Sequence, residues 1–263
     1  MGHSVTSGAA RASAEDAATF RPSRYPLWLL LAFAAFWLAM AYKPKYFQNW
    51  LLENVLTVLF VAGLVLTRRR FPLSNVSYTL IFVYLCLHTV GAHFTYSKVD
   101  YDAPFRALFG SGPTDWFGWR RNHFDRLVHF CFGLLLSYPI RELFLRVAGA
   151  RGFWGYYLPL DVTMSFSMVY ELIEWGAAVK FGGDLGQAYL GTQGDEWDAH
   201  KDMALASLGA LITMTVVACI NYAFDRHFGD EWRHSLAVKG STPLGEVRLK
   251  EILNGQRSGN GNE

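Results

Sequence analysis

Acidic residues and histidines recur at helical spacing within apolar stretches of this sequence. Asp125 and His129 are four positions apart, and Glu171 and Glu174 are three apart. Side chains three or four positions apart lie on one face of an α-helix, so each pair presents two ionisable groups to the same neighbour. Two longer sets share this spacing: Asp195, Asp198 and Asp202, and, if the helix continues past residue 94, His93, Tyr96 and Asp100.

Imidazole and carboxylate groups in one cluster are typical ligands of Zn²⁺, Mn²⁺ or Fe²⁺. Three such ligands and an open coordination position make a Lewis acid that activates water. We therefore predict a divalent metal ion, such as zinc, as the cofactor. The predicted metal ligands are His93, His129, Glu171 and Asp198, and Glu174 or Asp202 is predicted as a general base or as a partner of the ligands. The predicted substrate-binding residues are Tyr96, Asn122, Arg126 and Trp175.

Several of these residues also have an ordinary structural explanation. Asp195 and Asp198 stand near a predicted helix N-terminus, where acids cap free N–H groups and interact favourably with the helix dipole. Trp175 and Tyr96 fit the belt of aromatic side chains found at a membrane surface. Glu171 is different, because it lies roughly 10 Å inside the end of its segment. A lone carboxylate at that depth in hydrocarbon costs at least about 2.5 kcal/mol, which favours a functional polar cluster.

Six apolar segments must position these residues. Hydrophobic residues make up 52% of the 263 residues and charged ones 17%, below the roughly 25% typical of soluble domains. The segments have the length needed to cross about 30 Å of hydrocarbon and lack the alternation of barrel strands. The predicted fold class is all-α, a polytopic membrane protein built as a six-helix transmembrane bundle. The segments cover residues 26–42, 50–67, 75–94, 125–145, 153–179 and 199–224.

The distribution of Lys and Arg predicts the orientation of this bundle. Of the 24 Lys and Arg, 15 lie in the N-terminus, the loops at 68–70 and 141–151, and the C-terminal tail. By the positive-inside rule these parts and both termini face the cytoplasm. The acids and histidines then face the periplasm of a bacterial inner membrane. The predicted domains are a disordered segment at 1–24, the transmembrane domain at 25–225 and a cytoplasmic tail at 226–263.

The signatures of several enzyme classes are absent. The sequence contains no HExxH, GxSxG, Walker loop or GxGxxG motif, which excludes the usual templates of zinc proteases, α/β-hydrolases and nucleotide-binding enzymes. Its three cysteines form no CxxC pair, so neither a disulfide framework nor a thiolate metal site is predicted. A net charge of +2 gives no sign of a nucleic-acid partner.

Four segments resemble the YjdF-like family of bacterial inner-membrane proteins. They are HTVGAHFTYSKVDY, NHFDRLVHFCFGLLLSYPIRE, SMVYELIEW and GTQGDEWDAHKDMALASLGALI. This resemblance implies an inner-membrane protein but no particular reaction. The sequence is more distantly similar to the VanZ-like family, whose pattern of an Asp and a His, then a Glu, then an Asp corresponds to Asp125, His129, Glu171 and Asp202. That similarity implies a role in the cell envelope.

Besides a purely structural membrane module, two functions remain open at this stage. One is a metal-dependent membrane hydrolase or transferase whose periplasmic His/Asp/Glu site acts on lipid or cell-envelope material. The other is a non-catalytic membrane protein that binds or transports a metal ion, a proton or a lipid headgroup. The expected partners in both cases are the lipid bilayer and a lipid or envelope ligand. The sequence shows no clear inverted repeat, which argues against a transporter built from two matching halves.

Overall fold

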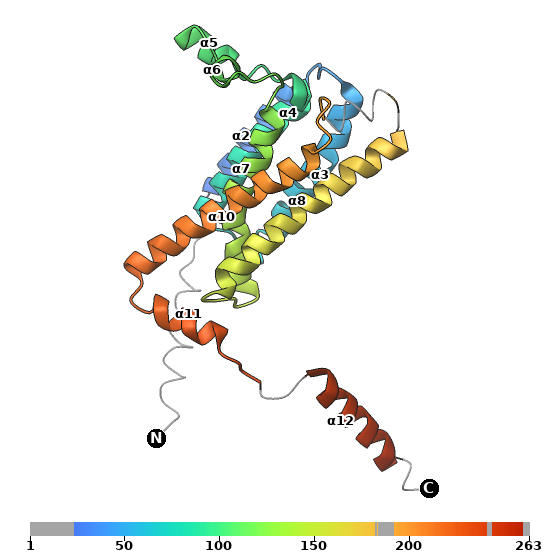
Figure 1. Cartoon of the computed structure of the whole chain (residues 1–263), viewed down its shortest axis with the longest axis vertical. Coiled ribbons are helices and arrows are strands. Elements are labelled where there is room, and N and C mark those ends of the chain that lie inside the picture. Colours follow the sequence, from blue (N-terminus) through green and yellow to red (C-terminus); the bar gives the residue numbers. More distant parts are fainter. Residues whose placement is uncertain (1–23, 182, 184–191, 241–243, 260–263) are drawn as a thin grey trace.

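The structure is a computed structural model that describes residues 24–181, 183, 192–240 and 244–259. Within these residues every regular element is a helix and no strand occurs (Figure 1). The predicted all-α fold is therefore confirmed. The disordered segment predicted at residues 1–24 lies outside the described residues, except for Arg24 at the start of the first helix.

Six long helices occupy the six predicted segments, and their ends differ from the predicted ends by at most three residues. They are α2 (Tyr25–Met40), α3 (Phe47–Thr67), α4 (Asn75–Phe94), α7 (Phe124–Val147), α8 (Trp154–Phe181) and α10 (Asp198–Phe224). Shorter helices connect or follow them: η1 (Tyr96–Lys98), α5 (Ala103–Phe109), α6 (Pro113–Phe117), α11 (Phe228–Leu236) and α12 (Leu244–Gly259). The last two lie in the segment predicted as a C-terminal tail.

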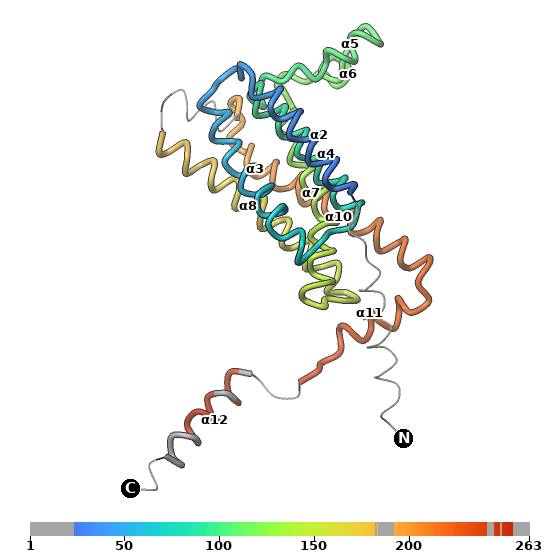
Figure 2. Tube along the Cα trace, turned by 180° about the vertical axis from the view of Figure 1, so that it is seen from behind, coloured from blue at the N-terminus to red at the C-terminus, as the bar shows by residue number. Residues whose placement is uncertain are grey.

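Helix α7 occupies the centre of the bundle. It packs against α4, α8 and α10, while α2 and α3 pack on α4 (Figure 2). Helices α4 and α8 end, and α7 and α10 begin, at the same end of the bundle (Figure 1). We call this the site end. Helices α5 and α6 project from the site end, whereas α11 follows α10 at the opposite end.

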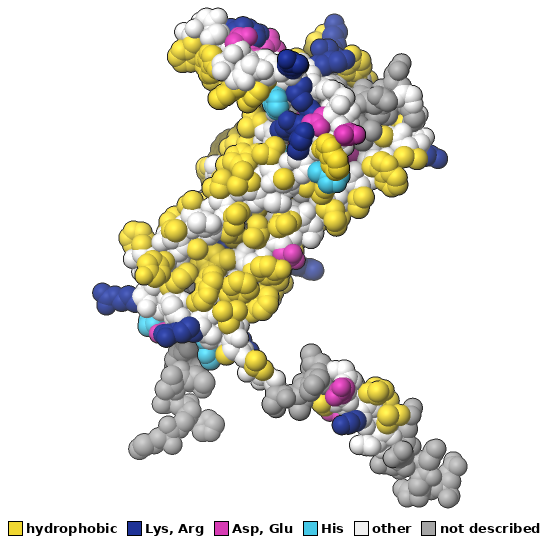
Figure 3. Space-filling model, in the orientation of Figure 1, with side chains coloured by type: hydrophobic (Ala, Val, Ile, Leu, Met, Phe, Trp, Pro, Cys, Tyr) yellow, Lys and Arg dark blue, Asp and Glu magenta, His cyan; other side chains and the backbone are white. Residues whose placement is uncertain are grey.

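Large apolar side chains cover the outside of the bundle. Leu66 and Phe224, for example, are 79% and 85% exposed, and Figure 3 shows apolar side chains along the bundle with Lys and Arg mostly near its ends. Soluble monomers rarely expose apolar surface on this scale, whereas a lipid-facing surface requires it. Helices α3, α4, α7 and α10 are long and apolar enough to cross a membrane. The chain is therefore a multi-pass membrane protein.

The count of six spans remains a prediction. Helix α2 has 16 residues, which is short of the roughly 17–25 residues of a spanning helix. Helix α8 is long enough at 28 residues, but it carries four ionisable residues: Asp161, Glu171, Glu174 and Lys180.

Small residues bring the backbones of α7 and α10 into direct contact. A Cβ atom added to Gly133 on α7 would lie 1.8 Å from the carbonyl oxygen of Ala206 on α10. One added to Gly209 on α10 would lie 2.2 Å from the carbonyl oxygen of Phe130. Ala206 and Ala210 are fully buried at the contact. Small residues at such positions allow membrane helices to approach closely.

This contact also sets the register between the two helices. Both begin at the site end, so they run in the same direction. His129 lies one helical turn before Gly133, and Asp202 lies one turn before Ala206. The Gly133–Ala206 contact therefore places His129 level with Asp202.

Substituting Gly209 with Ala is expected to destabilise the protein, because the added methyl group would overlap the backbone of α7. Overpacking of this kind typically costs about 1–3 kcal/mol, so the thermal unfolding midpoint in detergent should fall by several degrees. Gly176→Ala is the matched control, since a Cβ atom there meets nothing within 4 Å. Equal unfolding midpoints for the two variants would contradict the close helix contact.

The orientation of the bundle can be tested at the exposed turn between α5 and α6. Alkaline phosphatase inserted after Gly110 is expected to be active, because the site end is predicted to face the periplasm. Green fluorescent protein fused to the C-terminus is expected to fluoresce, because it folds in the cytoplasm. Inactive phosphatase at Gly110, at normal expression, would reverse the predicted orientation.

Candidate functional site

Three buried side chains from α7 and α10 converge near the site end. Asp125, His129 and Asp202 are 8%, 7% and 2% exposed, and one ligand atom from each lies within 4.8 Å of the other two. Asp125 and His129 share one face of α7, as their spacing predicts. Asp202 meets them because the register of α7 and α10 places it level with His129. Asp202 thus joins residues that precede it by 73 or more positions in the sequence.

Helix α8 adds two further carboxylates. Glu171 Oε1 lies 3.4 Å from His129 Nε2, which is also 3.7 Å from Asp125 Oδ1. Glu174 lies nearly one turn further along α8 and is 6% exposed. The structure therefore brings the predicted residues His129, Glu171 and Asp202 together, and adds Asp125. Their assignment as ligands or as a base stays a prediction.

Several carboxylate oxygens in this region have no hydrogen-bond partner among the described residues, although they are buried. These atoms are Glu171 Oε1, Asp198 Oδ2 and Asp202 Oδ1. A buried charge is costly unless it is paired or coordinates a metal. The unpaired oxygens, next to an imidazole, therefore suit a cation.

Ion pairs lie between this group and the site end of the bundle. Asp198 Oδ1 lies 2.7 Å from Arg121 Nη1 and 3.3 Å from Arg126 Nη2. Asp195 Oδ2 lies 2.6 Å from both Arg126 Nη2 and Lys201 Nζ. Asp198, a predicted metal ligand, is thus held by two guanidinium groups. Asp202, one turn deeper on α10, stands closer to His129 in the register.

Two loops are joined directly above the group. The backbone N–H of Asn122 donates to Gln193 Oε1, and Gln193 Nε2 donates to the Asn122 carbonyl, both at 3.0 Å. Arg121 Nη1 also donates to the Thr192 carbonyl at 3.1 Å. The Asn122 side chain donates to the Val99 carbonyl at 2.7 Å. Asn122, predicted to bind substrate, therefore holds loops together in this structure.

Helix α4 ends earlier than one prediction required. Thr95 has a φ of 67°, in the left-handed region that terminates a regular helix, so α4 stops at Phe94. His93, Tyr96 and Asp100 were predicted to share one helix face if the helix continued. That prediction is wrong, because the chain turns at Thr95 into a short 3₁₀-helix.

The group of Asp125, His129 and Asp202 does not include three other predicted site residues. His93 Nδ1 lies 2.6 Å from the Met40 carbonyl oxygen, between α4 and α2. The hydroxyl of Tyr96 lies 2.5 Å from His88 Nδ1. Trp175 is 63% exposed on α8, as expected of an aromatic belt. The Tyr96 ring packs on that of Phe124, the residue before Asp125, with 6.2 Å between ring centroids. No hydrogen bond, ion pair or ring contact joins His93 or Trp175 to His129 within the described part of the chain.

Glu53 was missed by the sequence analysis. It lies on α3, is 6% exposed, and accepts a hydrogen bond of 2.9 Å from the Tyr170 hydroxyl. The Tyr170 ring lies 5.7 Å from the His129 ring, in an edge-to-face arrangement. A single carboxylate within the apolar segment 50–67 was the available signal, because such residues are rare in membrane helices unless they have a partner.

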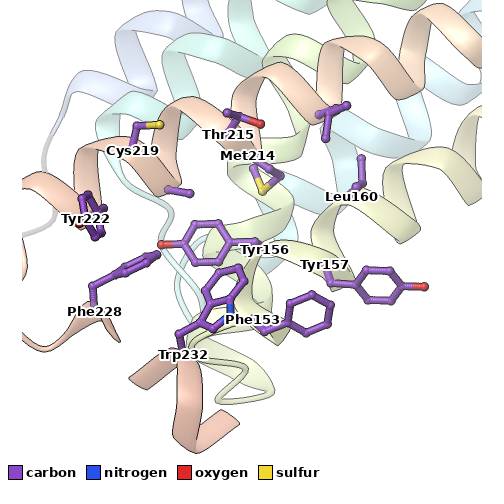
Figure 4. Close-up of a pocket in the computed structure, with 12 residues that line it drawn as sticks. Phe153, Tyr156, Tyr157, Leu160, Met214, Thr215, Cys219, Tyr222, Phe228 and Trp232 are labelled. Carbon is purple, nitrogen blue, oxygen red and sulfur yellow. The ribbon is translucent and has the colours of Figure 1, made fainter. Parts of the chain in front are cut away.

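A cavity of about 480 Å³ lies at the opposite end of the bundle, between α8, α10 and α11 (Figure 4). Its lining is apolar and aromatic, including Tyr156, Met214 and Trp232, with no carboxylate, imidazole or cation. It therefore takes no part in the polar group described above.

The pKa of Asp195, which lies in the loop outside the membrane helices, is lowered to about 2. The hydrogen bond from Lys201 is the main cause, and the Trp197 backbone N–H and Arg126 act in the same direction. An unfolded Asp has a pKa of about 3.9, so the folded state holds the carboxylate more firmly in its charged form. The stabilisation by Asp195 is thus full above about pH 4 and is lost as the pH falls toward 2.

Asp195→Asn is therefore expected to lower the thermal unfolding midpoint by a few degrees at pH 5–7. The difference from the wild-type protein should shrink between about pH 4 and 2, where the wild-type carboxylate becomes protonated. Glu196→Gln, an exposed neighbour in the same loop, is the control and should change little. A difference between wild type and Asp195→Asn that persists unchanged to pH 2 would contradict the ion-pair origin of this stability.

Known proteins support the assignment to a membrane family. A family model described as "Predicted membrane protein (DUF2238)" matches residues 25–222. The inner membrane protein YjdF of Escherichia coli (strain K12) is 38% identical over 182 residues, which are 69% of this chain and 83% of that protein. No solved structure matches this chain. The resemblance to YjdF-like proteins is confirmed, while the similarity to the VanZ-like family is not shown by these matches and stays a prediction.

Proposed function

The chain belongs to the DUF2238 family of predicted membrane proteins and lies in the bacterial inner membrane, and we propose that it is a metal-dependent enzyme of that membrane. Asp125, His129 and Asp202 hold a divalent metal ion, and the substrate is lipid or cell-envelope material. The observation that carries this proposal is the convergence of these three buried ligand groups from two helices.

The donor set fits a divalent ion. Two carboxylates and one imidazole suit Zn²⁺, Mn²⁺ or Fe²⁺. With metal–ligand distances of about 2.2 Å, two ligand atoms can lie at most about 4.4 Å apart. The three groups, within 4.8 Å of one another, would therefore move slightly closer on binding.

The remaining groups provide the chemistry of a hydrolase or transferase. A bound ion supplies a Lewis acid that polarises a carbonyl or phosphoryl oxygen and acidifies water. Glu171, whose Oε1 has no hydrogen-bond partner beside His129, is placed to accept a proton from that water. Glu174 lies nearly one turn away as a second carboxylate. The group lies about 6 Å inside the start of α10, given the rise of 1.5 Å per residue, within reach of a headgroup at the membrane surface.

Metal content tests the proposal directly. Wild-type protein purified in detergent is expected to hold about one divalent ion per chain by elemental analysis. His129→Ala and Asp202→Asn should lose it, with an affinity at least about a hundredfold weaker, since even partners outside the ligand set cost 10–100-fold. His200→Ala removes an exposed histidine from the same helix and should retain the ion. A wild-type protein without stoichiometric metal under any loading would remove the basis of the proposal.

A second candidate is a non-catalytic membrane protein that transports a proton. The hydrogen bond between Glu53 and Tyr170, whose ring contacts His129, favours it, because it extends the polar group across the bundle to α3. Vesicles containing the protein and a trapped pH dye would then show proton flux without added metal. Glu53→Gln should abolish that flux. Absence of flux in the wild-type protein would eliminate this candidate.

A further inference from the structure

Two arginines lie above the candidate metal ligands. Arg121 precedes α7 and Arg126 is in its first turn, and their side chains are only 14% and 16% exposed. Arg126 directly follows Asp125 in the chain. Asp198, which both arginines contact, lies one turn above Asp202 on α10. The guanidinium groups therefore lie about one helical turn, roughly 6 Å, from the Asp125–His129–Asp202 group.

The arginines have N–H groups that nothing in the described part of the chain satisfies. Arg121 uses Nη1 for Asp195, Asp198 and the Thr192 carbonyl. Its Nε and Nη2, and Nε of Arg126, are buried without a hydrogen-bond partner. The Nε and Nη2 atoms form the edge of a guanidinium that binds a carboxylate or phosphate through two parallel hydrogen bonds. An entire bidentate edge of Arg121 thus lacks a hydrogen-bond partner.

The local charge also favours an anion. Three cations, Arg121, Arg126 and Lys201, share two carboxylates, Asp195 and Asp198. With Asp125 counted among the metal ligands, these five side chains carry one more positive than negative charge.

The unpaired N–H groups of the two arginines thus lie about one helical turn from the unpaired carboxylate oxygens. The guanidinium donors suit an anion, and the free oxygens of Asp198, Asp202 and Glu171 suit a cation. A cation alone leaves the arginine donors unsatisfied, and an anion alone leaves the carboxylates unsatisfied. A phosphate group next to a divalent ion satisfies both layers, because its oxygens accept from guanidinium groups and also coordinate a metal.

We propose that Arg121 and Arg126 form a phosphate-binding subsite, so that the ligand of this site carries a phosphate group. The inference takes the neighbouring metal ion from the proposed function. The arginine subsite itself is tested by ligand binding, which requires no enzyme activity. The phosphate comes from a lipid headgroup or from a soluble phosphate ester. The location of the subsite at the mouth of the helices, beside the exposed Trp197 (57% exposed), is the depth at which headgroups lie.

The test measures ligand binding to the full-length protein in detergent and in nanodiscs. Native mass spectrometry compares phosphatidic acid with diacylglycerol, which has the same chains without the phosphate. Titration calorimetry measures the binding of inorganic phosphate and of glycerol 3-phosphate. The wild-type protein is expected to bind phosphatidic acid or the soluble phosphates, and to bind diacylglycerol at least tenfold more weakly. Binding of phosphatidic acid alone identifies a lipid headgroup as the source, and binding of the soluble phosphates identifies a soluble ester.

Arg121→Gln is expected to weaken phosphate binding at least tenfold. Arg106→Gln, which removes an exposed arginine paired with Asp100 at the same end, should leave it unchanged. If the Arg121→Gln variant does not fold, phosphate binding is measured on Arg121→Lys instead. This variant keeps the charge but lacks the bidentate edge, so it should also bind phosphate more weakly. No phosphate binding by the wild-type protein, or equal binding by the folded Arg121 variant, would overturn the subsite.

Metal analysis on the same samples separates the two proposals. Phosphate binding that depends on Arg121 in a protein without metal would support the subsite and contradict the metal-dependent enzyme. A metal-loaded wild-type protein whose phosphate binding does not respond to Arg121 would overturn the subsite and leave the metal proposal standing.

Discussion

The backbone contact between α7 and α10 is the constraint on which the polar site depends. Gly133 and Gly209 leave no room for a Cβ atom at this contact, and the two helices run in the same direction from the site end. A contact at Gly133 and Ala206 therefore fixes the levels one and two turns above it. His129 comes level with Asp202, and Asp198 lies one turn above Asp202, where Arg121 and Arg126 contact it. A small apolar contact in the middle of the bundle thus positions the acids and the imidazole at its end.

The two levels differ in how their charges are balanced. At the upper level, Asp195 and Asp198 are paired with Arg121, Arg126 and Lys201, and loop hydrogen bonds hold these groups in place. At the lower level, carboxylates surround one imidazole, and no described cation pairs with them apart from that imidazole. Burying carboxylates in this way is costly without a compensating charge. The imbalance is the physical reason for assigning a metal ion to the lower level and a phosphate group to the arginines above it.

Periodicity and segment length were enough to predict the helices, because a membrane helix needs a long apolar run and ends where polar residues begin. The pairs Asp125–His129 and Glu171–Glu174 followed from spacing within one helix. Spacing did not predict which residues form the group, because the packing of separate helices decides which carboxylate lies next to His129. Asp202 lies closer to it than the predicted ligand Asp198 for that reason. His93 lies against α2, where its Nδ1 is 2.6 Å from the Met40 carbonyl oxygen, and spacing along one helix does not predict such a neighbour. The link between Asn122 and Gln193 joins loops that no periodicity relates.

The location of the bound ion is the most direct test of this account. Crystals of the protein loaded with Mn²⁺ or Zn²⁺, measured at the absorption edge of the metal, would give an anomalous difference map. The account predicts one strong peak between Asp125, His129 and Asp202, about 2.0–2.2 Å from His129 Nε2 and from the carboxylate oxygens. A map with no peak in this group, or with the ion bound at His93 or elsewhere on the chain, would contradict it.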